Sequence, residues 1–248
     1  MVGGYRCCHS PRILWHWSDH FELYGPHQSR NTSRKQKVLY PMNTTQKKDT
    51  FSGKIVSIQP RSNVWRYRLD NRTHTLTGYN VFLKKDACSF TIAISEKQYQ
   101  KHGFRIGDVI EGTGWTKLYP KLEYADYYRC GALAILDRGD EKTTSASPYQ
   151  GELPDLATYS WRGCRMLDSR RWKGKCFTCK WAAMANVTIE YNWGVSQKHR
   201  FETFCYGPKS CKLYTMGKER AVPDKHCGTC YDVGWMDDLC TENRGYDE

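Results

Sequence analysis

The 248-residue chain has no long hydrophobic run. A membrane-spanning helix needs about 20 mostly apolar residues in succession, and no segment of this chain meets that requirement. The N-terminal stretch MVGGYRCCHSPRILWHWSDH also lacks the continuous apolar region of a signal peptide. We therefore expect a cytoplasmic protein with no membrane partner.

The chain also lacks the short motifs that mark common catalytic sites. It contains no G-x-x-x-x-G-K-[ST] phosphate loop, no G-x-G-x-x-G at a strand–helix junction and no H-E-x-x-H motif. Its carboxylates are scattered, whereas two-metal nuclease chemistry requires several of them together. We therefore expect no enzymatic activity and no small-molecule substrate. A metal-dependent nuclease, or an accessory subunit of one, stays open as an alternative.

Acidic residues are outnumbered by basic ones. The chain has 38 Lys and Arg against 26 Asp and Glu, a formal net charge of +12, and an aromatic content of 14%. A basic chain that is rich in aromatic residues indicates a polyanionic partner, and nucleic acid is the first to consider. The C-terminal stretch is the exception, because its charge is acidic.

Composition divides the chain into five expected parts. They are a basic N-terminal extension (1–50), a β-rich domain (51–136), a polar linker followed by a basic segment (137–175), a cysteine-containing hairpin (176–220) and an acidic tail (221–248).

The β-rich part, 51–136, contains alternating apolar residues that are typical of half-buried strands. In SFTIAIS, for example, Phe90, Ile92 and Ile94 share one face. A short helix is expected to follow, with Ser95 as its N-cap and Gly103 at its end. The order of three strands, one helix and two strands resembles an OB-fold-like five-stranded barrel. The expected fold class is therefore mainly β.

Twelve cysteines in a reducing compartment favour metal binding over disulfides. Two pairs flank a predicted hairpin in CFTCKWAAMANVTIEYNWGVSQKHRFETFCYGPKSC, and the predicted ligands are Cys176, Cys179, Cys205 and Cys211. Four thiolates complete the tetrahedral shell of Zn²⁺ and leave no open position, so the metal is expected to be structural. The pattern resembles a C-terminal zinc-ribbon hairpin module, although the second pair is more widely spaced than usual.

A further pair lies in the motif HCGTC. It could form a second metal site from His226, Cys227, Cys230 and Cys240. A redox pair and a set of mobile thiols remain alternatives.

Arginines alternate with aromatic residues in QPRSNVWRYRLDNRTHTLTGYN, a pattern that suits a nucleic-acid backbone running past stacked bases. We expect single-stranded RNA or DNA rather than duplex as the ligand. The candidate binding residues are Lys54, Arg61, Trp65, Arg66, Tyr67, Arg68, Arg72, Tyr79, Lys84, Lys85, Trp115, Lys198 and Arg200.

The phrases FETFCYGPKSC and ENRGYDE, together with the order of the parts, resemble a group of uncharacterised bacterial proteins. These proteins combine an OB-fold barrel, a four-cysteine zinc ribbon and an acidic tail. The resemblance implies a fold rather than an activity, and the group has no pair matching Cys227 and Cys230. The sequence thus predicts a non-catalytic nucleic-acid-binding protein. A protein-interaction adaptor within a larger complex is the alternative.

Overall fold

The computed structural model describes residues 45–67, 71–140, 143–191, 196–218, 221–224, 228–231 and 238–244. They all belong to the compact unit Met42–Glu248, and most of the expected N-terminal extension lies outside them. Strands predominate over helices, so the prediction of a mainly β protein is confirmed. None of the described helices has the length and apolar character required to cross a membrane.

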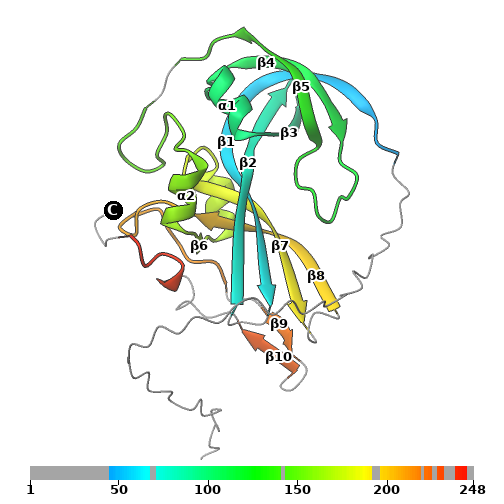
Figure 1. The fold of residues 1–248 in the computed structure, drawn as a ribbon. Coiled ribbons are helices and arrows are strands. Elements are labelled where there is room, and N and C mark those ends of the chain that lie inside the picture. Colours follow the sequence, from blue (N-terminus) through cyan, green and yellow to red (C-terminus); the bar gives the residue numbers. More distant parts are fainter. Residues whose placement is uncertain are drawn as a thin grey trace, which may run out of the picture. The chain divides into compact units, whose positions relative to one another are not determined.

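The elements are arranged as follows (Figure 1). The strands are β1 Lys48–Tyr67, β2 Asn71–Lys85, β3 Cys88–Ile94, β4 Val109–Thr116, β5 Tyr127–Asp137, β6 Arg165–Met166, β7 Ala182–Tyr191, β8 Ser196–Cys205, β9 Ala221–Asp224 and β10 Gly228–Tyr231. The helices are α1 Glu96–His102, α2 Leu156–Arg162 and α3 Ser169–Arg171, and a π-helical turn, η1 Trp172–Cys176, continues α3.

Five strands close into a ring. β1 pairs with β2 and β4, β2 pairs with β3, and β4 pairs with β5. One parallel pair, Ile92 with Tyr127, joins β3 to β5 and completes the circuit. Because α1 lies between β3 and β4 in the chain, the expected order of three strands, one helix and two strands is confirmed.

β1 is 20 residues long and links two parts of one eight-stranded sheet. Its first part pairs with β4 in the ring, whereas residues 62–67 pair in parallel with residues 185–190 of β7. Register shifts after Ile55 and Arg61 interrupt its ladder with β2. Such irregularities bend a strand, and β1 passes from the ring into the part of the same sheet where β7, β8 and β6 follow it (Figure 1). The expected barrel and the expected cysteine hairpin therefore share a strand.

The helix α1 begins and ends at the residues that the sequence predicts. The backbone N–H of Gln98 donates to Ser95 Oγ at 3.2 Å, and the Ser95 N–H donates to the Gln98 side chain at 3.0 Å. Gly103 ends the helix with a φ of +57°, which glycine adopts without steric cost. The predicted cap and end are both confirmed.

Two clusters of buried side chains stabilise the described residues. The larger one occupies the ring and continues along one face of β7 and β8, with members such as Ile55, Val81, Leu83, Val187 and Phe204. The smaller one contains Phe82, Leu167, Trp172, Ala182, Cys176, Cys179 and Cys205. Successive strand residues point to opposite faces. Phe82, between Val81 and Leu83, therefore places the smaller cluster on the outer face of β2.

Candidate metal centre

The four cysteines predicted as metal ligands come together in the structure. Cys176 ends η1, Cys179 precedes β7, Cys205 ends β8 and Cys211 lies in the following loop. The antiparallel pairing of β7 with β8, in which Ala182 lies opposite Cys205, brings the two ends of this segment together. All four side chains line one cavity of about 10 Å³, close to the volume of a single water-sized sphere.

The thiols of this cavity lie in a strongly desolvating environment. Burial raises the pKa of Cys176 to about 11 and that of Cys179 to about 12, and the neighbouring cysteines add to both shifts. Such thiols stay protonated unless a positive charge favours the thiolate. Within the described ranges, no three His, Cys, Asp or Glu side chains are placed closely enough to hold an ion as they stand. Metal binding would therefore draw these thiols together.

Groups that favour a thiolate surround Cys205. Burial raises the pKa of its thiol, but a hydrogen bond from the Gly207 N–H and the charges of Arg165 and Arg244 oppose this shift. The Gly207 nitrogen lies 3.3 Å from Cys205 Sγ. Burial lowers the pKa of Arg244 to about 10, so a nearby anion would stabilise the charged form of its guanidinium. This corner of the cavity is suited to holding a negatively charged sulfur.

Arg244 reaches the site from the predicted acidic tail, and it is not among the residues predicted from the sequence. Its guanidinium donates to the carbonyl oxygens of Gly207 and Gly163. Gly163 permits a close approach of this segment, because a Cβ there would lie 1.6 Å from the carbonyl oxygen of Cys240. The only hint in the sequence is a basic residue within an acidic stretch.

The second metal site stays a prediction. Of its four expected ligands, His226 and Cys227 lie outside the described residues. The backbone of Cys230 is part of β10, and Cys240 is partly exposed in the segment that contacts Gly163.

The segment that leads into the first cysteine pair covers the outer face of β1 and β2. The rings of Trp172 and Phe177 pack on Phe82, with centroid distances of 6.1 and 5.0 Å. Trp172 Nε1 donates to Gln59 Oε1 at 3.1 Å, and Gln59 Nε2 donates to the Phe177 carbonyl at 2.6 Å. Ser57 also donates to this carbonyl. Because Ser57, Gln59 and Phe82 are all buried, this face is closed to an external ligand.

Three of the predicted nucleic-acid-binding residues are engaged in internal contacts. Tyr79 is 1% exposed and donates to the Pro154 carbonyl at 2.8 Å, so its expected role as a stacking platform is corrected. The Arg61 guanidinium donates to the Thr77 carbonyl at 2.7 Å. Arg200 Nε lies 2.5 Å from the carboxylate of the buried Glu202.

The other predicted binding residues do not form one continuous group along the β1–β2 hairpin. Lys54 and Lys84 are exposed cross-strand partners, with Lys85 next to them. Trp65, 44% exposed, lies 11 residues farther along β1, a separation of roughly 36 Å at about 3.3 Å per residue. The exposed members thus lie at opposite ends of a long hairpin.

Of the remaining members, Lys198 lies at the same end of the sheet as Trp65, because Ile189 of β7 pairs with both Arg66 and Lys198. Trp115 is half-buried on β4 opposite Tyr128, and Lys198 is exposed on β8. Arg66, Tyr67 and Arg72 are known only by their backbone pairing, in which Arg66 lies opposite Arg72 and Tyr67 opposite Asn71. Arg68 lies outside the described residues.

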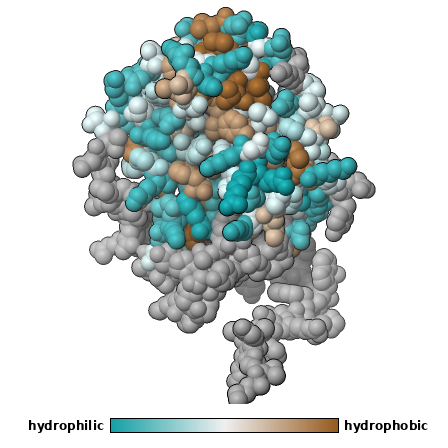
Figure 2. Space-filling view, turned by 180° about the vertical axis from the view of Figure 1, so that it is seen from behind, coloured by the Kyte–Doolittle hydropathy of each residue, from teal (hydrophilic) through white to brown (hydrophobic). Residues whose placement is uncertain are grey.

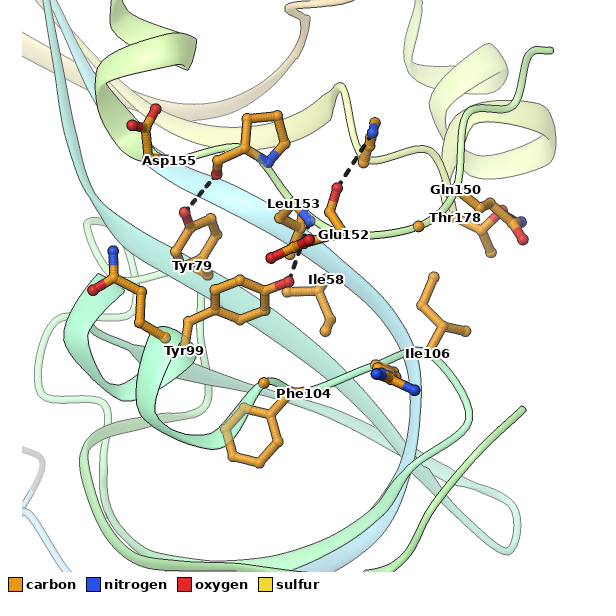
Figure 3. Close-up of a pocket in the computed structure, with 16 residues that line it drawn as sticks. Ile58, Tyr79, Tyr99, Phe104, Ile106, Gln150, Glu152, Leu153, Asp155 and Thr178 are labelled. Atoms are coloured by element: carbon orange, nitrogen blue, oxygen red, sulfur yellow. Dashed lines mark hydrogen bonds between the residues drawn. The ribbon is translucent and has the colours of Figure 1, made fainter. Parts of the chain in front are cut away.

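A cleft of about 410 Å³ lies between α1, the ring and the segment 150–155 (Figure 3). The hydroxyl groups of two tyrosines point toward that segment: Tyr79 donates to Pro154, and Tyr99 accepts from the Leu153 N–H at 3.2 Å. Lys180 Nζ donates to the Glu152 carbonyl at 3.3 Å. The two tyrosines attach the segment to the ring and Lys180 attaches it to the residues before β7, so the cleft is best explained as the seam between these parts.

Apolar and hydrophilic side chains are unevenly distributed on the surface. In Figure 2, apolar side chains gather in the upper part of the view, where Figure 1 places the ring. Leu136 of β5, 55% exposed, is one large apolar residue of the ring's surface. Hydrophilic side chains dominate the described surface lower in this view.

Comparisons with protein families, with curated proteins and with solved structures find no match to this chain.

Proposed function

We propose that this is a non-catalytic nucleic-acid-binding protein, in which an OB-fold-like barrel and a zinc-ribbon-like hairpin form one platform for single-stranded RNA or DNA. The observation that carries the proposal is the pairing order of the ring, β1-β2-β3-β5-β4, with α1 between β3 and β4. A ring of five strands with one helix resembles the OB-fold, a five-stranded barrel that binds oligonucleotides. The net charge of +12 supplies the attraction for phosphates.

We also propose one structural Zn²⁺, held by Cys176, Cys179, Cys205 and Cys211. The shared cavity of the four thiols supports this assignment. Zn²⁺ with four thiolates carries a net negative charge, which Arg165 and Arg244 would offset. A complete set of protein ligands leaves no position for water or substrate, so the metal would stabilise the hairpin without taking part in chemistry.

The test is the binding of fluorescently labelled oligonucleotides, measured by anisotropy over a series of salt concentrations. We expect binding at about 50 mM salt that weakens linearly in log affinity against log salt. Lack of binding at this low salt would contradict the proposal and favour the protein-interaction adaptor. Cleavage of the oligonucleotide in the presence of Mg²⁺ would instead favour the nuclease.

A further inference from the structure

We infer that the nucleic acid is held by its phosphates on a basic turn, which we define as Arg170, Arg171, Lys173 and Lys175. The inference rests on the proposed function and names the surface that performs it. This surface lies on the segment that covers β1 and β2, and it differs from the face that the sequence indicated.

The surface that an OB-fold commonly uses is filled by the chain itself. OB-folds bind oligonucleotides on the face of their second and third strands and in the loops after the first and fourth strands. In this protein Phe82 of β2 lies beneath Trp172 and Phe177. Tyr124, in the loop between β4 and β5, packs against Phe201 of β8 with a centroid distance of 5.3 Å. A ligand cannot occupy this face while the cover is in place.

The covering segment is anchored by its apolar side and turns its charges outward. Trp172 and Cys176, four residues apart, are buried, whereas all four residues of the basic turn are exposed. The carboxylate of Asp168 accepts hydrogen bonds from the backbone N–H groups of Arg170 and Arg171, at 2.9 and 3.0 Å. The charges are thus presented on a fixed support, which lowers the entropic cost of binding.

Basic residues outnumber acidic ones around the turn. Asp168, Glu202 and Glu219 border the segments 169–180 and 203–218, but neither segment contains Asp or Glu, and together they contain Arg170, Arg171, Lys173, Lys175, Lys180, Lys212 and Lys218. The two segments lie side by side, since Arg171 Nε donates to Thr215 Oγ1 at 3.1 Å and the Asp168 N–H donates to the Thr215 carbonyl at 2.9 Å.

The ring differs in this respect. Lys117 pairs with Asp126 at 2.9 Å, and Arg138 pairs with the buried Asp108 at 3.0 Å. Uncompensated charges within a Debye length, about 8 Å at physiological salt, reinforce one another in attracting a polyanion. The basic turn therefore concentrates positive charge that can attract a polyanion.

The turn presents no ring for base stacking, because its aromatic residue, Trp172, is 4% exposed. Phosphate contacts position a nucleic acid without reading its sequence. We therefore expect binding that depends strongly on salt and little on base sequence.

The experiment compares two variants that lose the same charge. The first, Arg170→Gln with Lys173→Gln and Lys175→Gln, changes the turn and spares Arg171, which contacts Thr215. The second, Lys54→Gln with Lys84→Gln and Lys85→Gln, changes the rival surface at the ring end of the hairpin. Affinity for labelled 20-nucleotide dT and mixed-sequence oligonucleotides is measured from about 50 to 200 mM salt, after equal thermal midpoints and zinc contents show that both variants are folded.

We expect the turn variant to bind at least tenfold more weakly, with a log–log salt slope that is smaller by about 2, since each phosphate contact contributes roughly 0.7 for single strands. The hairpin variant should keep the wild-type slope. The inference is overturned if wild-type protein binds and the turn variant keeps its slope, or if the hairpin variant shows the larger loss. Absence of binding by the wild-type protein would instead contradict the proposed function itself.

Discussion

The two buried clusters of the protein differ in the chemistry of their side chains. The larger one has 23 buried members among the described residues, mostly aliphatic and aromatic. The smaller one has seven, and three of them are cysteines. Burial of a large apolar side chain contributes about 1.5–3 kcal/mol, so apolar packing can stabilise the ring. The smaller cluster has too few such side chains, and we expect a metal to supply the difference.

Loss of the proposed metal should produce the largest difference in stability between the two clusters. In zinc-finger peptides, Zn²⁺ binding contributes about 10–16 kcal/mol, and the binding energy is folding energy. Cys179→Ser or a strong chelator should unfold the region around the smaller cluster and leave the ring largely folded. Hydrogen exchange followed by mass spectrometry should show protection lost at 172–182 and 203–214 and retained in β3 and β4.

The exposed Cys88 provides the matched control, and Cys88→Ser should keep wild-type protection. Equal loss of protection throughout the ring would contradict the idea that the two clusters have different sources of stability.

The next largest effect should come from Trp172→Ala. This change removes the contacts with Phe82 and Phe177 and the hydrogen bond to Gln59, and truncation of a buried tryptophan costs about 3–5 kcal/mol. Chemical denaturation would measure the free energy of unfolding. Trp161→Ala, at a position that is 53% exposed, should change it by no more than about 0.5 kcal/mol. Similar losses in both variants would mean that Trp172 does not anchor the cover.

A smaller effect is expected for Arg244→Gln, which removes a buried charge beside Cys205. Hydrogen bonds from charged donors contribute about 1.5–3 kcal/mol, and we expect a loss of about 2 kcal/mol in unfolding free energy. The variant should also release zinc to a colorimetric chelator faster than wild type. Unchanged zinc release would show that Arg244 stabilises only the backbone around Gly207.

The smallest effect should come from Tyr79→Phe, within the larger cluster. The change removes one hydrogen bond to the Pro154 carbonyl, with an expected cost of about 1 kcal/mol. Oligonucleotide affinity should not change, because Tyr79 has no exposed face. A clear loss of affinity in the folded variant would contradict this expectation and show that Tyr79 takes part in binding.

Local signals in the sequence predicted the local structure well. The order of elements in the ring, the cap at Ser95 and the end at Gly103 all depend on neighbouring residues, and each is found. The convergence of the four cysteines follows from the hairpin between the two pairs. The burial of Tyr79 could also have been predicted, because Tyr79 lies on the same face of its strand as the apolar residues Val81 and Leu83.

Long-range contacts were not predictable in the same way. The pairing of β1 with β7 joins residues more than 120 positions apart and leaves no periodic signal. The cover of the strand face by Trp172 and Phe177 likewise depends on how distant segments pack. For this reason the sequence did not predict that the outer face of β1 and β2, at Ser57, Gln59 and Phe82, is covered.

The account depends most directly on the metal at the smaller cluster, which would hold the segment that carries the basic turn. The decisive measurement is the zinc content per chain of folded protein purified without added metal, by elemental analysis. The account predicts about one equivalent of tightly bound zinc, with a second only if the site at His226, Cys227, Cys230 and Cys240 also forms. Well-folded protein without zinc, in which the four thiols react freely, would contradict it.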